Sequence, residues 1–181
     1  MSFFNTKELL SELKQLVISH INYAESLKNN TSEELQYKKT AKSWSVLECL
    51  EHLNLYAEFY NNEIRKRIEK SKHQKSTVFK SGYLGNKFAL DMLPKERMKT
   101  MNTFKSKNPI YSKLDKKVVL ERFIIFQKEL LELLELAENK NLTKIKTAIT
   151  LPLLKFRLGD TFRFVINHNQ RHIVQAKNIC K

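Results

Sequence analysis

The chain has 181 residues, of which only three are glycine and three are proline, and its formal net charge is +14. This length suits one domain with a single core, here residues 1–181, and so few turn-forming residues disfavour an all-β fold. No run approaches the ~18 apolar residues that a membrane-spanning helix needs, and the N-terminus lacks the pattern of a signal peptide. We therefore expect a cytoplasmic protein without a membrane partner.

Helical periodicity recurs along the chain and predicts an all-α fold. Good helix formers fill most of the sequence, and apolar residues recur at spacings of three and four in four segments. These segments cover approximately residues 5–28, 45–72, 114–139 and 160–181. Ser45 and Glu48 have the spacing of a capping box. Asp115 is expected to cap the third helix and Asp160 the fourth, with Gly159 as a flexible start.

The connection between the second and third predicted helices, residues 73–113, is unusually long for a compact domain. Such a connection usually has a function or contains further structure. Its apolar residues, among them Phe79, Phe88 and Phe104, predict that it packs on the helices. Its length would let the second and third helices run parallel. The shorter join before the fourth helix has enough β-branched residues for a brief extended piece.

Half of the net charge lies in residues 80–117, which contain ten lysines and arginines and three acids. A basic stretch of this kind can indicate nucleic-acid binding. However, no predicted helix presents a basic face with base-reading residues, and no nucleic-acid-binding motif occurs. We therefore prefer solvated lysines and rank nucleic acid as the least favoured partner.

Histidines are the strongest candidates for a functional site. His168 and His172 stand four residues apart, so a helix places both on one face with Cβ atoms about 5–6 Å apart. That spacing is common by chance, but His52 borders a similar apolar stripe on the second helix. If the two helices are neighbours, three neutral imidazoles converge and leave a coordination position open, as in catalytic zinc sites. Imidazole also suits nickel, iron and copper. We expect His20 to be a hydrogen-bonded core residue and His73 to be solvated.

Two motifs resemble those of the DinB-like superfamily, which includes the YfiT-type hydrolases. WSVLECLEHL, Trp44 to Leu53, is similar to its Trp-Ser opening followed by a histidine, and HNQRHIVQ is similar to its C-terminal His-x-x-x-His-x-x-Gln. The resemblance implies a four-helix bundle with up-down-down-up topology and a long crossover from helix 2 to helix 3. It also implies a divalent metal (Zn, Ni or Fe) held by His52, His168 and His172. Some relatives are thiol-dependent transferases or isomerases, and many pair as homodimers.

Three further residues are weaker candidates near such a site. Glu48, one turn before His52, or Gln175 would orient a ligand histidine, and Arg171 or the basic connection would hold an anionic substrate. The alternatives are that Glu48 serves only the helix start and that Arg171 is solvated. No serine or cysteine is paired with a base, as a triad enzyme would require. Cys49 is expected to be a buried apolar residue.

The sequence thus favours a metal-dependent hydrolase or thiol transferase acting on a small molecule, with a low-molecular-weight thiol as a candidate co-substrate. The alternative is a non-catalytic, metal-stabilised module for dimerisation or partner binding. HNQRH lacks the glutamate of the HExxH motif, so metalloprotease chemistry is not indicated.

Overall fold

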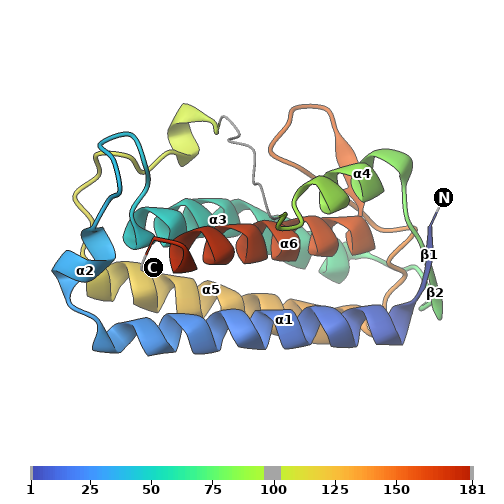
Figure 1. Cartoon of the computed structure of the whole chain (residues 1–181). Helices are drawn as coiled ribbons and strands as arrows, with labels where there is room; N and C mark the ends of the chain where they lie inside the picture. Colours follow the sequence, from blue (N-terminus) through green and yellow to red (C-terminus); the bar gives the residue numbers. More distant parts are fainter. Residues whose placement is uncertain (1, 96–102, 180–181) are drawn as a thin grey trace.

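Four long helices lie side by side and make up most of the molecule (Figure 1). The computed structural model describes residues 2–95 and 103–179. The long helices are α1 (Thr6–Ser26), α3 (Val46–Lys70), α5 (Lys116–Ala137) and α6 (Leu158–Lys177). Shorter helices are α2 (Ser32–Gln36), α4 (Tyr83–Asp91) and two 3-10 turns, η1 (Leu27–Asn29) and η2 (Lys105–Lys107). The predicted all-α class is therefore confirmed, and none of the described helices could span a membrane.

Each of α1 and α3 contacts both α5 and α6. Between them the long helices enclose two apolar clusters. Buried polar side chains from different helices meet inside the molecule. His20 Nε2 on α1 donates to Gln170 Oε1 at 2.9 Å, and Asn169 Nδ2 donates to Gln127 Oε1 on α5 at 3.2 Å. His20 is thus a hydrogen-bonded core residue, as predicted. Hydrogen bonding is what makes the burial of such groups tolerable.

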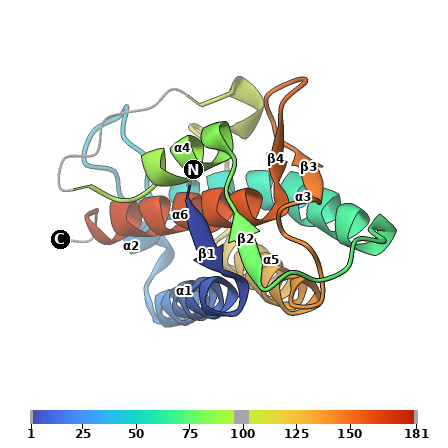
Figure 2. The same cartoon turned by 90° about the vertical axis from the view of Figure 1, so that its right-hand side faces the viewer.

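Two small antiparallel strand pairs complete the fold (Figure 2). Strand β1 (Phe3–Asn5) pairs with β2 (Val78–Lys80), and β3 (Lys146–Ala148) pairs with β4 (Lys155–Arg157). The second pair is the extended piece predicted before the last helix. In the first pair, β2 belongs to the long connection, which also contains α4 and η2, and β1 precedes α1. Arg97 and Lys99 of the predicted basic stretch lie outside the described residues.

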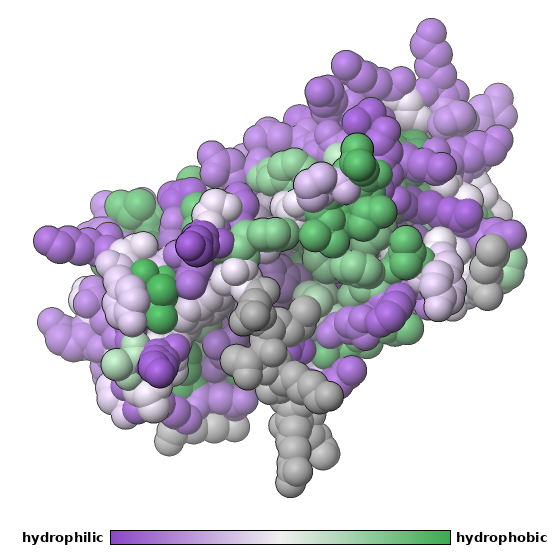
Figure 3. All heavy atoms as spheres, turned by 90° about the horizontal axis from the view of Figure 1, so that it is seen from above, coloured by the Kyte–Doolittle hydropathy of each residue, from purple (hydrophilic) through white to green (hydrophobic). Residues whose placement is uncertain are grey.

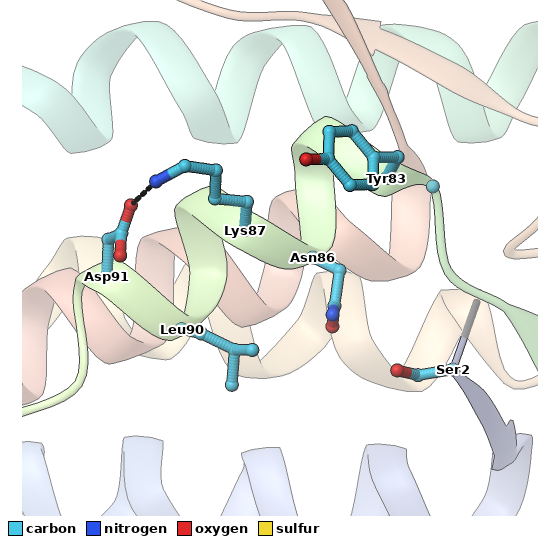
Figure 4. Close-up of a pocket in the computed structure, with 7 residues that line it drawn as sticks. Ser2, Tyr83, Asn86, Lys87, Leu90 and Asp91 are labelled. Atoms are coloured by element: carbon cyan, nitrogen blue, oxygen red, sulfur yellow. Dashed lines mark hydrogen bonds and ion pairs between the residues drawn. The ribbon is translucent and has the colours of Figure 1, made fainter.

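The connection packs on the helices only in part. Phe79 is fully buried and Phe88 packs against the core, whereas Tyr83, Leu90 and Phe104 are exposed. A hollow of about 390 Å³ beside α4 is lined in part by Asn86, Leu90 and the Lys87–Asp91 ion pair (Figure 4). It contains none of the candidate site residues.

Helix starts were predicted correctly at two positions and wrongly at one. Ser45 and Glu48 form a complete capping box, and the Asp115 side chain accepts a hydrogen bond from the Val118 amide. The fourth helix, in contrast, begins at Leu158 with Arg157 in the cap position. Asp160 therefore lies inside the first turn. Gly159 is not a flexible start but a helical position where a Cβ atom would come within 2.6 Å of the Phe79 ring.

Asp160 instead ties the connection to α6. Its buried carboxylate accepts hydrogen bonds from the Ser81 hydroxyl and, at 2.7 Å, from the Gly82 amide. Arg163 lies 3.4 Å from the same carboxylate and also donates to Asn86 Oδ1 at 2.8 Å. Helix α4 approaches so closely that a Cβ atom on Gly85 would lie 2.6 Å from the Asp160 Cβ. The result is a buried ionic anchor for α4.

Replacing Asp160 with alanine is expected to lower the free energy of unfolding by about 3–5 kcal/mol, because it leaves the buried Arg163 guanidinium without its counter-charge. Chemical denaturation of both proteins measures this difference. The control is Asp91→Ala, which removes an exposed ion pair with Lys87 (2.8 Å) and should change stability by less than about 1 kcal/mol. Equal effects of the two substitutions would contradict the assigned anchor.

Candidate metal centre

Three imidazole rings converge between α3 and α6. His52 Nε2 lies 3.2 Å from His168 Nε2, and His172 Nε2 lies 3.1 Å from the same atom. All three ligand atoms lie within 4.8 Å of one another. The local cause is helix geometry, since residues four apart on α6 share a face and α3 packs directly against it. The structure therefore brings together the three histidines that the sequence singled out.

Hydrogen bonds fix the tautomers of two rings. His52 Nδ1 donates to the carbonyl oxygen of Lys107 at 2.6 Å, and His172 Nδ1 donates to Gln175 Oε1 at 2.9 Å. In the neutral rings this leaves both Nε2 atoms without a proton. His168 Nε2 can donate a proton to only one of them at a time. In at least one of the two close Nε2–Nε2 contacts, therefore, two lone pairs face each other with no proton between them.

Burial keeps these rings neutral. Desolvation lowers the pKa of His52 to about 4 and that of His172 to about 3, although the hydrogen bonds to Lys107 and Gln175 act in the opposite direction. It also holds the pKa of His168 well below its usual value. At neutral pH the site is therefore a set of uncharged nitrogen donors rather than a cluster of imidazolium groups.

This donor set fits a divalent cation. Nitrogen ligands at 2.0–2.1 Å around a tetrahedral ion lie about 3.3 Å from each other. The observed separations of 3.1 and 3.2 Å are close to that value. A cation would also coordinate the facing lone pairs, which receive no proton from a side chain in these contacts. The residues present therefore suit a metal ion held by three histidines.

Comparison with known proteins agrees with this geometry. The sequence model of the DinB superfamily matches residues 15–176, a range that includes all three histidines. The chain belongs to the DinB superfamily. The assignment predicted from WSVLECLEHL and HNQRHIVQ is thus confirmed. No curated protein and no solved structure matches the chain.

The DinB superfamily is metal-binding, and in this member aromatic rings enclose the histidines. The Trp44 ring lies 4.7 Å from that of His52 and 5.6 Å from that of His172, measured between centroids. Tyr56 contacts His52 and His168 edge-on, and Phe164 lies parallel to His168 at 6.1 Å. These contacts restrict ring rotation and reduce access of water. Tyr56 and Phe164 were not predicted as site residues, although both lie one turn from a candidate histidine on the same helix.

The long connection of this DinB protein also reaches the site. Its turn η2 places the Lys107 carbonyl on His52, and the Lys107 ammonium donates to the Leu55 carbonyl and lies 5.7 Å from the centre of the Tyr56 ring. Lys107 was not predicted at the site because its contact with His52 is made by a backbone atom 55 residues away. Such an acceptor has no residue signature.

The weaker candidates differ in what they contact. Gln175 binds His172, as a ligand-orienting residue would. The Glu48 carboxylate accepts hydrogen bonds from the Ser45 amide at 2.8 Å, from Lys38 at 2.6 Å and from the Tyr111 amide at 3.3 Å. It therefore caps α3 and holds the long connection, and these contacts involve none of the three histidines. Arg171 is buried, which makes the solvated alternative wrong.

The remaining two predictions concern residues away from the site. His73 is exposed, as expected. Cys49 is fully buried, and desolvation raises the pKa of its thiol above the usual range. Cys49 is therefore an inert core residue and not a nucleophile.

Proposed function

We propose that this DinB-superfamily protein is a metal-dependent enzyme that acts on a small molecule, as a hydrolase or a thiol-dependent transferase. The observation that supports it most is the convergence of three neutral imidazole rings whose Nε2 atoms face one another. Three protein ligands leave a coordination position for substrate, which is the pattern of catalytic rather than structural sites. The ligands do not distinguish Zn, Ni and Fe.

His52, His168 and His172 would hold a divalent ion, which would supply Lewis acidity and so make a bound water or thiol nucleophilic near neutral pH. The chain itself holds the ligands in position. The Lys107 carbonyl and the Gln175 amide keep a proton on Nδ1 of His52 and His172, so that Nε2 stays available. Trp44, Tyr56 and Phe164 exclude water from one side of the rings.

Charged groups next to the site favour an anionic substrate. The Lys107 ammonium lies over Tyr56, whose ring contacts both His52 and His168. Arg171 follows His168 on α6 and is buried. We assign both residues to the binding of a negatively charged group. The thiol of Cys49, the cysteine among the described residues, is buried and protonated, which favours an external nucleophile, either water or a low-molecular-weight thiol.

Turnover assays test the proposal. Protein loaded with Zn, Ni or Fe is compared with the chelated protein in two reactions, transfer of a small thiol to an aryl halide and hydrolysis of an activated ester. Metal loading is expected to raise one of the two rates by about 100-fold or more, in the range that metal-activated nucleophiles provide. Metal-loaded protein that is inactive in both reactions, and that binds neither a thiol nor an anionic product analogue, would contradict it.

We also propose that the four long helices form an up-down-down-up bundle, and that the protein is a homodimer. The contacts of α1 and α3 with both α5 and α6 support the bundle, and the chain directions in Figure 1 are consistent with it.

The exposed apolar residues of α4 favour the alternative of a non-catalytic partner-binding module. Light scattering before and after chelation separates metal-dependent assembly from metal-dependent chemistry.

A further inference from the structure

The tip of the β3–β4 hairpin is apolar and projects into solvent. Leu153 is fully exposed, and the neighbouring Pro152 and Leu154 are exposed as well. Leu153 also has a left-handed backbone conformation, with φ of 65°. A side chain in this region costs about 1–2 kcal/mol. The fold thus holds a large apolar side chain outward in an unfavourable conformation and gives it no partner among the described residues.

The outer face of the same hairpin is basic. The register pairs Lys146 with Arg157 and Ala148 with Lys155. Thr147 and Phe156 point inward and are buried, so alternation places Lys146 and Lys155 on the opposite face, where both are exposed. Arg157 is half-buried and donates to the Lys80 carbonyl at 2.6 Å. Between Glu138 and Asp160 the chain has five basic residues and no acid.

The acid that faces the hairpin is already neutralised. Glu63 on α3 accepts a hydrogen bond from the Ala148 amide at 2.7 Å and pairs with Arg67 at 2.7 Å. Lys146 and Lys155 are exposed and form no ion pair within the described part of the chain, so the hairpin presents positive charge behind its apolar tip. Figure 3 looks onto the side where the hairpin and α4 lie in Figure 1, and it shows hydrophobic residues gathered in one area with hydrophilic residues around them.

We propose that this hairpin docks the protein onto an anionic lipid surface. Leu153 and Leu154 enter the headgroup region, while Lys146 and Lys155 contact lipid phosphates. Each basic residue near such a surface contributes about 1 kcal/mol, and the apolar side chains add the burial of their surface. A protein partner is favoured less, because a projecting tip lacks the roughly 800 Å² that a stable interface buries on each side.

This attachment is peripheral and does not depend on the metal centre. The sequence led us to expect no membrane partner, because no segment is long and apolar enough to span a membrane. Binding through a hairpin needs no such segment. The proposal therefore goes beyond the proposed enzymatic function and can fail or succeed separately from it.

Vesicle co-sedimentation of the full chain tests the proposal. We expect binding to vesicles of phosphatidylcholine mixed with phosphatidylglycerol, little binding to phosphatidylcholine alone, and a decrease with added salt. Leu153→Ser combined with Leu154→Ser should weaken binding by about tenfold or more, and Lys146→Glu combined with Lys155→Glu should do the same.

Matched controls lie on α5, where Leu136 and Lys128 are also exposed. Leu136→Ser and Lys128→Glu should keep full binding, and circular dichroism together with metal content verifies that every variant is folded. Absence of vesicle binding, equal binding to both lipids, or unchanged binding by the hairpin variants would overturn the proposal. So would hairpin variants that change the oligomeric state of a protein that does not bind vesicles, since the tip would then contact protein.

Discussion

Replacing His168 with alanine is expected to abolish metal binding while the helices remain folded. His168 Nε2 is the atom that both other Nε2 atoms approach, at 3.2 and 3.1 Å. Without it, His52 and His172 are two ligands from different helices with no third donor in the cluster. Elemental analysis should show a fall from about one ion per chain to almost none. Helical circular dichroism should be retained.

Two further variants make this result specific. His73→Ala removes an exposed histidine and should leave the metal content unchanged. Gln175→Leu removes the acceptor on His172 Nδ1 and should weaken metal affinity by about 10–100-fold without abolishing binding. Metal retained in full by His168→Ala, or lost equally in His73→Ala, would contradict the assigned ligand set.

Acid is expected to destabilise the metal-free protein steeply below pH 6.5. Burial lowers the folded pKa of His20 and His52 to about 4 and of His172 to about 3, and it also lowers that of His168. The unfolded chain, with histidine pKa values near 6.5, then binds more protons than the folded chain. The stability from these neutral rings is complete above pH 6.5 and is lost as the pH falls toward the folded values.

The size of this effect follows from the number of rings. Each histidine contributes up to about 1.4 kcal/mol per pH unit, so four together approach about 5 kcal/mol per unit below pH 5.5. Urea unfolding of chelated protein at a series of pH values measures the slope. His20→Gln should remove about one quarter of it, and His73→Ala should leave it unchanged. A free energy of unfolding that is constant between pH 7 and 5 would show that the rings are not held neutral.

Much of the helical architecture could be predicted because it depends on local patterns. Periodic apolar residues located all four long helices, and the Ser45–Glu48 and Asp115 caps follow from side chains and amides three residues apart. Asp160 was misassigned because its partners, Ser81 and Gly82, are 79 and 78 residues away. A carboxylate near a helix start has the same local signature whether it caps that helix or binds a distant segment.

The site shows the same division between local and distant information. The pair on α6 follows from helical spacing, and His52 was added by the resemblance to the superfamily and by its place on an apolar stripe. The Lys107 carbonyl could not be predicted, because it reaches His52 only through the folded path of the connection. The lipid contact that we propose for the hairpin tip was not predicted either, since ITLPLL in a sequence is equally consistent with a buried strand.

X-ray absorption spectroscopy at the metal edge, on protein purified without a histidine tag, tests the central claim most directly. The account predicts a bound divalent ion coordinated by three imidazole nitrogens at about 2.0–2.1 Å, together with one or more oxygen ligands from solvent. It also predicts loss of the imidazole scattering in His52→Ala and His172→Ala. Protein that binds no divalent ion, or binds one through sulfur or carboxylate ligands instead of three imidazoles, would contradict it.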